Sequence, residues 1–378
     1  MRFDPLIFTP GYSNLEESIK NTMLHLPMHH REEKFKIHFK SCKEKLKKIL
    51  NMEEIIMLSC SGSGAMEACV STFCNNPLCI NSGKFGKRYI DIAKTLKIDF
   101  VSINTPSNIS PTIEEISNTI KQNKKIDSIC MQICESSSGL RHSIESILKE
   151  IKKIDSNILT IVDGIASIGA EKISTAYIDV LIASPSKAFG IPPGLSIIGF
   201  NNLAKRVMQE RNKRSFYFDL HRELLLSYEN TTSFTPSTSS IIALDKYLEA
   251  LNLDDLYCHI YASAIATRKS LQAIGLKIYP ETPSISMSVI YSENSRMIIE
   301  LLEKEYNIKI ANGQDELRDK VFRISHMGGI PLYKLLWLIN AIELVLNKLN
   351  IRKFNGCSNR IFLDSYYEAY ENYKANLK

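Results

Sequence analysis

The sequence predicts an α/β protein with a large domain, in which helices flank a mostly parallel sheet, and a smaller C-terminal α+β domain. Between residues 55 and 200, short apolar runs alternate with segments of helical periodicity. The apolar runs are nearly continuous, which is typical of strands that helices cover on both faces. After residue 200 the pattern is first more charged and then shorter and mixed. A length of 378 residues suits two domains.

The large domain is predicted to contain seven strands, over residues 55–59, 78–82, 100–104, 126–134, 158–163, 180–184 and 196–200. Helical spacing is found over 65–73, 87–96 and 143–154. Another helix is predicted after Thr112, because Thr112 and Glu115 form a capping-box signal. It precedes an apolar stripe at i, i+3 and i+7.

We divide the chain into an N-terminal arm (1–15), the large domain (16–250), the small domain (251–350) and a C-terminal extension (351–378). In the small domain, helices are predicted over 260–273, 296–305 and 332–348, and strands near 285–291 and over 321–326. The extension has tyrosines at helical spacing, namely Tyr366, Tyr370 and Tyr373. We interpret it as a helix that docks on this subunit or its neighbour.

Composition narrows the class of protein. The net charge of +6 is modest, and the lysine-rich pieces have helix-like spacing, which indicates solvated helix faces and no nucleic-acid partner. No apolar run reaches the roughly 18 residues of a membrane span, and the N-terminus lacks a signal-peptide layout. The nine cysteines lie mostly in apolar segments, which indicates reduced thiols in the cytoplasm. Because no Cys-x-x-Cys pair occurs, we expect no metal site.

The residues that follow the predicted strands are the candidates for chemistry. In an open parallel sheet, ligands bind beyond the carboxyl ends of the strands. The segments at this edge are Ser61–Gly64, Asn81–Gly86, Glu135–Gly139, Asp163 and Lys187. The first of them, in "SCSGSGAMEA", joins a strand to a helix, so its N–H groups and hydroxyls form an anion-binding cup. The alternative is a plain tight turn. The loop is neither a Walker A motif nor a G-x-G-x-x-G fingerprint.

Asp163 and Lys187 follow neighbouring apolar runs. A buried carboxylate needs a partner, which is either the helix that follows, as an N-cap, or a protonated atom of a cofactor. Lys187, in "SPSKAFGIPPG", is either a solvated lysine or a Schiff-base amine whose pKa is lowered by desolvation. A phosphate cup, a buried Asp and a Lys, in this order along the chain, fit pyridoxal 5′-phosphate chemistry.

The sequence resembles the class V, fold-type I aminotransferases, in particular the alanine–glyoxylate and serine–pyruvate branch, over about residues 6–350. Nine motifs occur in register: TPGYSN (9–14), HRE (30–32), SGSGAMEA (61–68), NSGKFGKR (81–88), ESSSG (135–139), VDGIASIGA (162–170), SPSKAFGIPPGLS (184–196), TPST (235–238) and FRISHMG (322–328). Single motifs are weak signals, but nine in the same order make coincidence improbable.

The resemblance implies the site residues. Lys187 would hold the cofactor and move the substrate's Cα proton, and Asp163 would pair with the pyridinium nitrogen. The implied cofactor contacts are Ser61, Gly62, Ser63 and Gly64 at the phosphate, Phe85 over the ring, Ser137 beside it, and Thr235 at the phosphate of the neighbouring subunit in a homodimer. Arg323 would clamp the substrate α-carboxylate bidentately. The alternatives are core packing for Phe85 and a surface ion pair for Arg323.

Three positions depart from the family pattern. Ser186 replaces the glutamine that often precedes the lysine, so a phosphate contact is expected to be lost or water-mediated. Thr232 stands where the family has a tyrosine that contacts the partner subunit. Gly11-Tyr12 replaces the usual Gly-Pro, and Tyr12 would narrow the substrate entrance.

The resemblance implies transfer of an amino group between a small amino acid and a 2-oxo acid, of the alanine or serine with glyoxylate or pyruvate type, in two half-reactions. One alternative is a class V lyase such as a cysteine desulfurase, for which Cys357 is the candidate nucleophile in a loop-like context. The other is a non-catalytic protein that holds a phosphorylated ligand.

Overall fold

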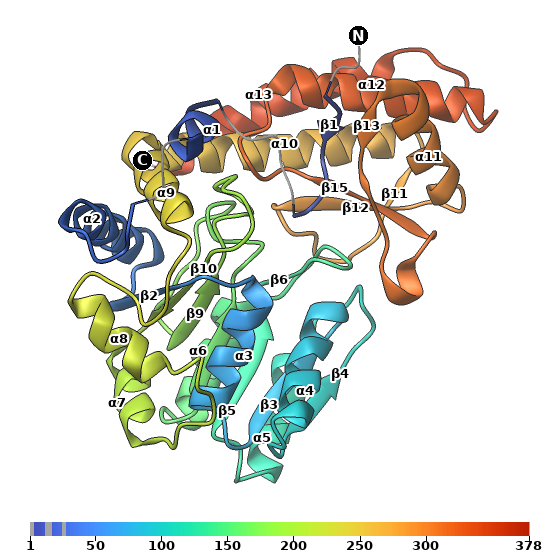
Figure 1. Ribbon diagram of the computed structural model, residues 1–378. Helices are drawn as coiled ribbons and strands as arrows, with labels where there is room; N and C mark the ends of the chain where they lie inside the picture. The colour runs from blue at the N-terminus through green and yellow to red at the C-terminus, as the bar shows by residue number, and fades with distance from the viewer. Residues whose placement is uncertain (1–3, 12–16, 25–27, 378) are drawn as a thin grey trace.

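The computed structural model describes residues 4–11, 17–24 and 28–377. It contains a seven-stranded sheet in the lower half of Figure 1 and a four-stranded sheet in the upper half, next to three long C-terminal helices. The strands of the larger sheet come from residues 54–200, and those of the smaller sheet from residues 277–325. The α/β class and the two sheets agree with the sequence-based prediction.

The seven predicted strands of the large domain all form one sheet. Its strand order is β2-β10-β9-β8-β5-β3-β4. The strands are β2 (Glu54–Leu58), β3 (Pro77–Asn81), β4 (Val101–Asn104), β5 (Ser128–Gln132), β8 (Leu159–Asp163), β9 (Val180–Ala183) and β10 (Ser196–Phe200). Only β10 is reversed: it is antiparallel to both β2 and β9, whereas the other neighbouring pairs are parallel.

The sequence predicted a single strand over residues 126–134, and this prediction is wrong: the run is divided between β5 and the short strand that begins at Cys134. After β5, Ile133 N donates to Asp163 O (2.9 Å) and His142 N donates to Ile133 O (2.9 Å). The chain then enters a short hairpin of β6 (Cys134–Glu135) and β7 (Leu140–Arg141). Gly139 has a φ of 74°, a conformation that glycine adopts readily. The run remains apolar because the segment stays buried beyond the end of the strand.

Helices cover both faces of the large sheet. One hydrophobic cluster includes side chains of α2 (Glu33–Leu50), α5 (Ile113–Gln122) and α6 (Ile144–Ile154). The second includes side chains of α3 (Gly62–Phe73), α4 (Lys84–Thr95), α7 (Asn202–Glu210) and α8 (Leu220–Tyr228). Successive residues of one strand alternate between the clusters, as Leu181 and Ile182 do.

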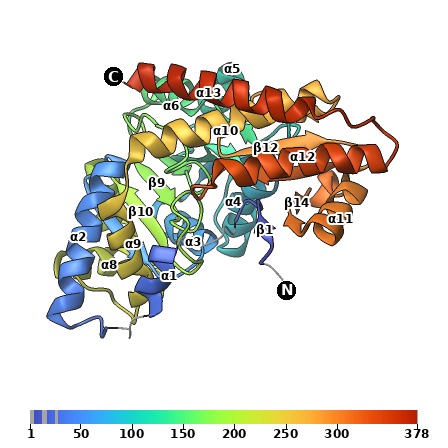
Figure 2. The same ribbon diagram turned by 90° about the horizontal axis from the view of Figure 1, so that it is seen from above.

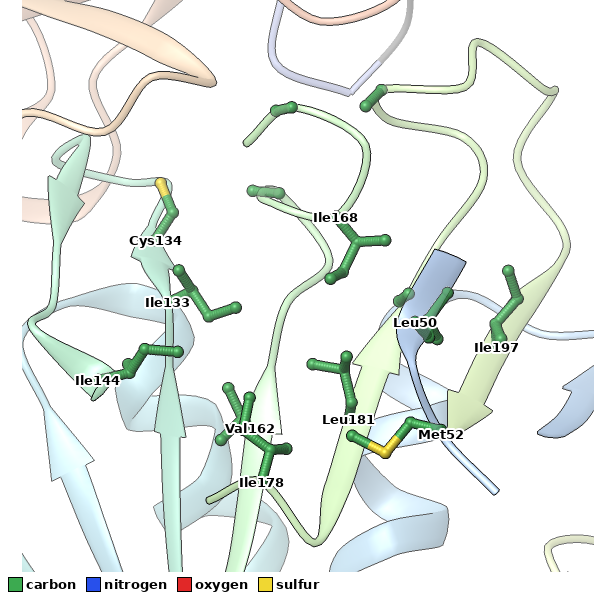
Figure 3. Close-up of a cluster of buried hydrophobic side chains, with 14 of the residues drawn as sticks. Leu50, Met52, Ile133, Cys134, Ile144, Val162, Ile168, Ile178, Leu181 and Ile197 are labelled. Atoms are coloured by element: carbon green, nitrogen blue, oxygen red, sulfur yellow. The ribbon is translucent and has the colours of Figure 1, made fainter. Parts of the chain in front are cut away.

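Figure 3 shows part of the first cluster, where Val162 and Leu181 of neighbouring strands point to the same side as Ile133 and Ile168. Each of these four side chains is at most 6% exposed. Full burial of such a side chain contributes about 1.5–3 kcal/mol. The packing fixes the positions of the loops that follow β5, β8 and β9, and these loops carry the candidate site.

The second sheet has the order β11-β12-β15-β14 and is antiparallel throughout. Its strands are β11 (Lys277–Ile278), β12 (Met287–Tyr291), β14 (Ala311–Asn312) and β15 (Val321–Ser325). The helices of this part are α10 (Leu253–Ala273), α11 (Ser295–Tyr306) and α12 (Leu332–Lys348). The helix α10 begins seven residues before the predicted position 260, because Asn252 caps it by accepting from Asp255 N. It follows α9 (Thr238–Ala250), and α1 (Glu17–Leu24) lies against α9.

The N-terminal strand packs with the small domain. The strand β1 (Leu6–Ile7) pairs in parallel with β13 (Ile308–Lys309). Phe8 is buried among the small-domain side chains, and its carbonyl accepts from Ser325 N (2.8 Å). Two residues later, Pro10 and Gly11 reach the edge of the large sheet. A segment that starts in the small domain therefore ends over the large domain.

The C-terminal extension forms α13 (Cys357–Leu377), which packs along α10 and beside α12 (Figures 1 and 2). Tyr366 is buried, and its hydroxyl lies 2.7 Å from His259 Nδ1 on α10. The buried Glu343 of α12 accepts the N–H groups of Asn355 and Gly356, both at 3.1 Å, before α13 begins. The helix thus docks on this subunit. Across the described residues, no helix is both long and apolar enough to cross a membrane.

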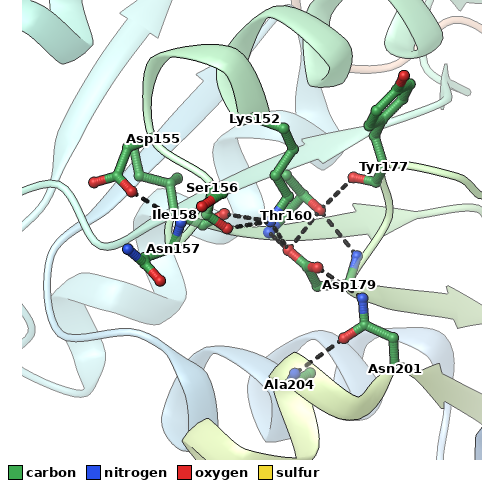
Figure 4. A network of polar contacts seen from close by, with 10 residues as sticks. All are labelled: Lys152, Asp155, Ser156, Asn157, Ile158, Thr160, Tyr177, Asp179, Asn201 and Ala204. Carbon is green, nitrogen blue, oxygen red and sulfur yellow. Dashed lines mark hydrogen bonds and ion pairs between the residues drawn. The ribbon is translucent and has the colours of Figure 1, made fainter.

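A polar network holds the amino-terminal ends of β8 and β9 together (Figure 4). Asp179, just before β9, is 3% exposed. Its Oδ2 accepts from Lys152 Nζ (2.5 Å), Thr160 N (2.8 Å) and Thr160 Oγ1 (3.0 Å). Its Oδ1 accepts from Asn201 Nδ2 (2.8 Å). Both oxygens are therefore satisfied inside the protein.

Candidate active site

A cavity of about 230 Å³ lies at the carboxyl ends of β8 and β9. Residues from several separate connections form its wall, as expected at this edge of a parallel sheet. Eight of the residues that we predicted from the sequence line it: Gly11, Ser61, Gly62, Ser63, Phe85, Asp163, Ser186 and Lys187. The tertiary structure thus brings together side chains that are up to 176 positions apart (187 − 11).

Lys187 stands in the loop that follows β9. Its Nζ donates to the carbonyl of Pro10 (2.9 Å). Burial lowers the pKa of the Lys187 ammonium; nearby Asp163 opposes this shift, and Arg323 adds to it. A side chain at position 11 would place its Cβ 3.1 Å from Lys187 Nζ, so Gly11 allows the N-terminal segment to approach the amine closely. The environment favours a neutral amine, which is the form that attacks a carbonyl.

Asp163 is the last residue of β8 and is 6% exposed. Its Oδ1 accepts from Ile165 N (2.8 Å), but the chain continues into turns and β9, and the next helix begins only at Asn202, so the N-cap alternative for this residue is wrong. Among the described residues, no donor lies within hydrogen-bond distance of its Oδ2. Burial raises the pKa of Asp163 to about 6, and Glu135 contributes in the same direction. A protonated nitrogen in the cavity would satisfy this carboxylate.

The Gly/Ser loop opens helix α3. Ser61 is its N-cap in an extended conformation, and the Ser61 hydroxyl makes no capping hydrogen bond. The first N–H groups of a helix have no acceptor within the helix, so those beside the cavity are available to an anion. A Cβ at Gly62 would lie 2.3 Å from Ile165 Cδ1. Gly64 is outside the wall, and a Cβ there would lie 2.9 Å from Cys60 Sγ.

The buried Glu135, which belongs to the predicted segment Glu135–Gly139 but was given no role of its own, holds the loop of Phe85. Its Oε2 accepts from Phe85 N (3.0 Å), Gly86 N (2.9 Å) and Gln132 Nε2 (2.8 Å). Its Oε1 accepts from Ser137 N (3.0 Å) and Ser137 Oγ (2.5 Å). A carboxylate directly after a predicted strand was the available signal.

Ser137 lies behind the cavity wall, where its Oγ also accepts from Lys84 N (3.2 Å). Ser136 forms the wall at this point. Ser137 and Glu135 together fix the start of α4, and Phe85 faces the cavity from this helix. A hydroxyl that already binds a carboxylate and an N–H has little capacity left for a ligand.

Arg323 projects from β15 of the small domain and is 7% exposed. Its Nε donates to Asn312 O and its Nη1 to Ser136 O, both at 2.9 Å. A guanidinium has five N–H donors, so the remaining ones are available for a carboxylate. Burial lowers the pKa of Arg323 to about 10, which leaves it charged near neutral pH. The surface-ion-pair interpretation does not apply, because no carboxylate of the described residues pairs with Arg323.

Arg88, which was not predicted as a site residue, lines the cavity, whereas Arg323 is not part of its wall. Its Nη1 donates to Ser63 Oγ (2.7 Å), and its guanidinium lies 4.6 Å from the centre of the Phe85 ring. The signal was present in the sequence, since Arg88 closes the motif NSGKFGKR (81–88) that also contains Phe85.

Other predicted residues lie elsewhere. Thr232 and the exposed Thr235 line a separate surface depression, and Thr232 Oγ1 donates to Phe234 O (2.7 Å). Tyr12 lies outside the described residues. Cys357 is the first residue of α13, where its Sγ lies 3.3 Å from Arg352 Nη2, and it is not in the cavity wall. The cysteine of the lyase alternative therefore does not line the cavity that contains Lys187.

A larger cavity of about 360 Å³ lies between α1, α9 and α10. Its wall is formed by helices, and Asp255 and His259 are among its polar residues. It is away from the carboxyl ends of the parallel strands, and neither Lys187 nor Asp163 lines it. Chemistry and position in the sheet, not volume, therefore identify the smaller cavity as the candidate active site.

A mostly parallel sheet with a partly buried lysine and a buried aspartate at its carboxyl edge fits a pyridoxal-phosphate enzyme, and comparison with known proteins gives the family. The family model described as "Aminotransferase class-V" matches residues 14–318, so the chain belongs to the class V aminotransferases. A protein of Helicobacter pylori named "Uncharacterized aminotransferase" is 39% identical over 367 residues, which cover 96% of this chain and 99% of that protein.

More distant matches include the L-aspartate–glyoxylate aminotransferase of Paracoccus denitrificans, which is 24% identical and covers 91% of this chain and 92% of its own length. The solved structure of alanine–glyoxylate aminotransferase from Nostoc sp. superposes with a TM-score of 0.85 at 23% identity and covers 92% of this chain and 96% of its own. These similarities agree with the fold-type I architecture.

The chain is thus a pyridoxal-phosphate-dependent transaminase, and its residues fit that cofactor. The cavity combines a helix N-terminus for a phosphate, a desolvated lysine for an aldehyde, and a carboxylate with an unpaired oxygen for a ring nitrogen. Glycines at positions 11 and 62 keep the space free where side chains would collide.

Proposed function

We propose that this aminotransferase moves an amino group between a small amino acid and a 2-oxo acid, of the alanine or serine with glyoxylate or pyruvate type. The observation that carries the proposal is that Lys187 and Asp163 line the same cavity. Burial disfavours the charged form of both groups, lowering one pKa and raising the other. When bound, pyridoxal phosphate supplies an aldehyde that takes up the amino group and a ring that withdraws electrons from the substrate Cα.

Lys187 is proposed as the residue that holds the aldehyde and afterwards moves the Cα proton. A general base works best when its pKa lies near the working pH, and burial shifts the pKa of this lysine in that direction. While the amine is free, the Pro10 carbonyl accepts its hydrogen bond and keeps it directed into the cavity.

Asp163 is proposed to keep the ring nitrogen protonated. Without a pyridinium in the cavity, burial holds the pKa of the Asp163 carboxyl at about 6. A bound pyridinium would lower this pKa, since an opposite charge within about 4–6 Å favours the charged form. The same interaction would favour the protonated nitrogen.

Arg323 is proposed to bind the substrate α-carboxylate, because its two backbone contacts hold the guanidinium while leaving donors free. Pro10 and Gly11 lie against the Lys187 amine, and this close approach of the backbone supports a substrate with a small side chain. Relatives from Paracoccus denitrificans and Methylorubrum extorquens are named L-aspartate–glyoxylate and serine–glyoxylate aminotransferase, which supports glyoxylate as one of the two substrates.

We also propose a homodimer with shared active sites, in which Thr235 and Thr232 contribute to the phosphate site of the partner subunit. Thr235 is exposed, which leaves its side chain accessible to a neighbour, whereas Thr232 is buried beside it and its hydroxyl donates to Phe234 O. A cytoplasmic location is supported by nine free cysteines, most of them buried.

Two measurements test the function. The purified protein should be yellow, and borohydride should remove the colour and fix the cofactor on the peptide that contains Lys187. A panel of amino donors with glyoxylate, pyruvate and 2-oxoglutarate should show amine transfer from alanine or serine. Label on another lysine would overturn the site, and release of sulfide from cysteine without amine transfer would indicate a lyase.

A further inference from the structure

Arg88 is a cation of the cavity that has no ion-pair partner among the described residues. No carboxylate of the described chain lies within ion-pair distance of its guanidinium, and its hydrogen bond goes to the neutral Ser63 hydroxyl (2.7 Å). The side chain is partly buried and lines the cavity. Since a partly desolvated guanidinium without a counter-charge is costly, this position calls for an anion.

The geometry places Arg88 on the side of the Gly/Ser loop. It lies one turn into α4, three residues after Phe85, so both side chains leave the helix on the same face. The guanidinium lies near the Phe85 ring, 4.6 Å from its centre, and this contact restricts its orientation. Its other contact, Ser63, belongs to the first turn of α3. Arg88 therefore connects the N-terminal turns of two helices that both face the cavity.

The charges around the cavity favour a phosphate over a second carboxylate as this anion. Arg88 lies close enough to Asp163 and Lys187 to lower the pKa of both groups. Ser186, also in the wall, has its hydroxyl 2.9 Å from Ser184 Oγ and is therefore already paired. A phosphate monoester carries about −1.5 to −2 charges near pH 7, which helix N–H groups alone do not neutralise. Arg323, by contrast, contacts Ser136 and Asn312 on the small-domain side.

We propose that Arg88 binds the phosphate of the cofactor together with the Gly/Ser loop of Ser61–Gly64. This inference rests on the proposed role of that loop as the phosphate site. Arg88 would then be a cofactor-binding residue with a charge-assisted, directional contact, held in place by Ser63 and by the Phe85 ring.

The test compares pyridoxal phosphate with pyridoxal, which has the same aldehyde and ring without the phosphate. Both are titrated into the full-length chain freed of cofactor. Binding is followed by the visible absorbance of the adduct that the aldehyde forms with the Lys187 amine. The variants are Arg88→Met, Arg88→Lys and the matched control Lys87→Met, which removes the same charge from the exposed neighbouring position.

We expect Arg88→Met to weaken pyridoxal phosphate about 10- to 100-fold, the usual effect of losing a hydrogen bond to a charged group, and to change pyridoxal less than about 2-fold. Arg88→Lys, which keeps the charge but loses the planar fork, should weaken the phosphate form less. Lys87→Met should match the wild type. If Arg88→Met does not fold, the same ratio measured on Arg88→Lys decides the matter.

An equal loss for both ligands, or no loss for either, would overturn the proposal. So would an unchanged affinity for pyridoxal phosphate with a raised KM for a dicarboxylic amino acid, because Arg88 would then bind substrate. If the wild type itself binds no pyridoxal phosphate on Lys187, the proposed function fails. If the wild type binds pyridoxal phosphate on Lys187 but Arg88→Met leaves the ratio of the two affinities unchanged, only the proposed role of Arg88 fails.

Discussion

Two buried carboxylates on neighbouring parallel strands have opposite surroundings. Asp179, before β9, accepts four hydrogen bonds, and both of its oxygens are paired (Figure 4). Asp163, at the end of β8, accepts one, from Ile165 N. Because β8 and β9 are parallel, the two groups lie at opposite ends of the sheet.

The difference separates a region that stabilises the fold from a region that binds a ligand. At the amino-terminal ends the protein supplies every donor that Asp179 needs, so the network is complete without a ligand. At the carboxyl ends an oxygen of Asp163, the amine of Lys187 and the guanidinium of Arg88 face one cavity. Polar groups that folding leaves unsatisfied mark a functional site. The predictions below test this contrast, from the largest expected effect to the smallest.

Lys187→Ala should lower kcat by about 10⁴-fold or more, because it removes both the covalent attachment and a general base. The midpoint of chemical unfolding of the cofactor-free chain should stay close to that of the wild type. Turnover and unfolding are measured on the same preparations, with Lys172→Ala at an exposed position as the control. Turnover at the wild-type rate would remove Lys187 from the mechanism.

Asp179→Asn should have the reverse effect. It leaves the partly buried Lys152 ammonium without its counter-charge. It also places an amide N–H where the carboxylate now accepts from donors such as Thr160 N. Breaking a buried pair in this way costs about 3–5 kcal/mol of stability. Urea unfolding should show this loss, while the kcat of the folded fraction should change little. Asp155→Asn, at an exposed position of the same network, is the control. A large loss of kcat with unchanged stability would contradict the contrast.

Asp163→Asn should stabilise the cofactor-free chain at about pH 7.5. Burial raises the pKa of Asp163 from its usual 3.8 to about 6, so in this range the native chain binds a proton more tightly than the unfolded chain. Wild-type stability should therefore fall as the pH rises from about 4 to about 6. The variant should lack this step and gain up to about 3 kcal/mol above it.

The pH dependence of unfolding, measured for both cofactor-free proteins, checks this prediction. The two curves should converge below about pH 4, where the wild-type carboxyl is protonated in both states. Affinity for pyridoxal phosphate should decrease in the variant, although its fold is more stable. A variant that is less stable at every pH would show that Asp163 acts like Asp179.

Glu135→Gln sharpens the comparison, because Glu135 is a fully paired carboxylate at the functional end. The amide would direct an N–H at groups that now donate to the carboxylate, such as Phe85 N and Ser137 N. We expect a loss of about 1–2 kcal/mol of stability together with a shifted absorbance of the bound cofactor, since the start of α4 would move. Glu114→Gln, on the exposed face of α5, is the control. Lost stability with an unchanged spectrum would make Glu135 purely structural.

Much of this organisation was readable from the sequence. Apolar runs gave the seven strands of the large sheet, and Thr112 was correctly predicted as a helix cap, since its hydroxyl accepts from Glu115 N (3.1 Å). The positions of Lys187 and Asp163 at strand ends followed from the same pattern. These features depend on neighbours within a few positions along the chain, because capping, turn formation and alternation are local.

The sequence by itself determined the α/β class, the order of the strands along the chain and the lysine–aspartate pair. Only the tertiary structure decided that β10 is reversed, that Pro10 accepts from an amine 177 positions away, that Arg88 lines the cavity, and that Glu135 holds the loop of Phe85. The physical reason is that strand pairing, and the identity of the group that pairs with a buried charge, depend on packing between residues far apart in the sequence. Local periodicity does not encode which distant groups meet.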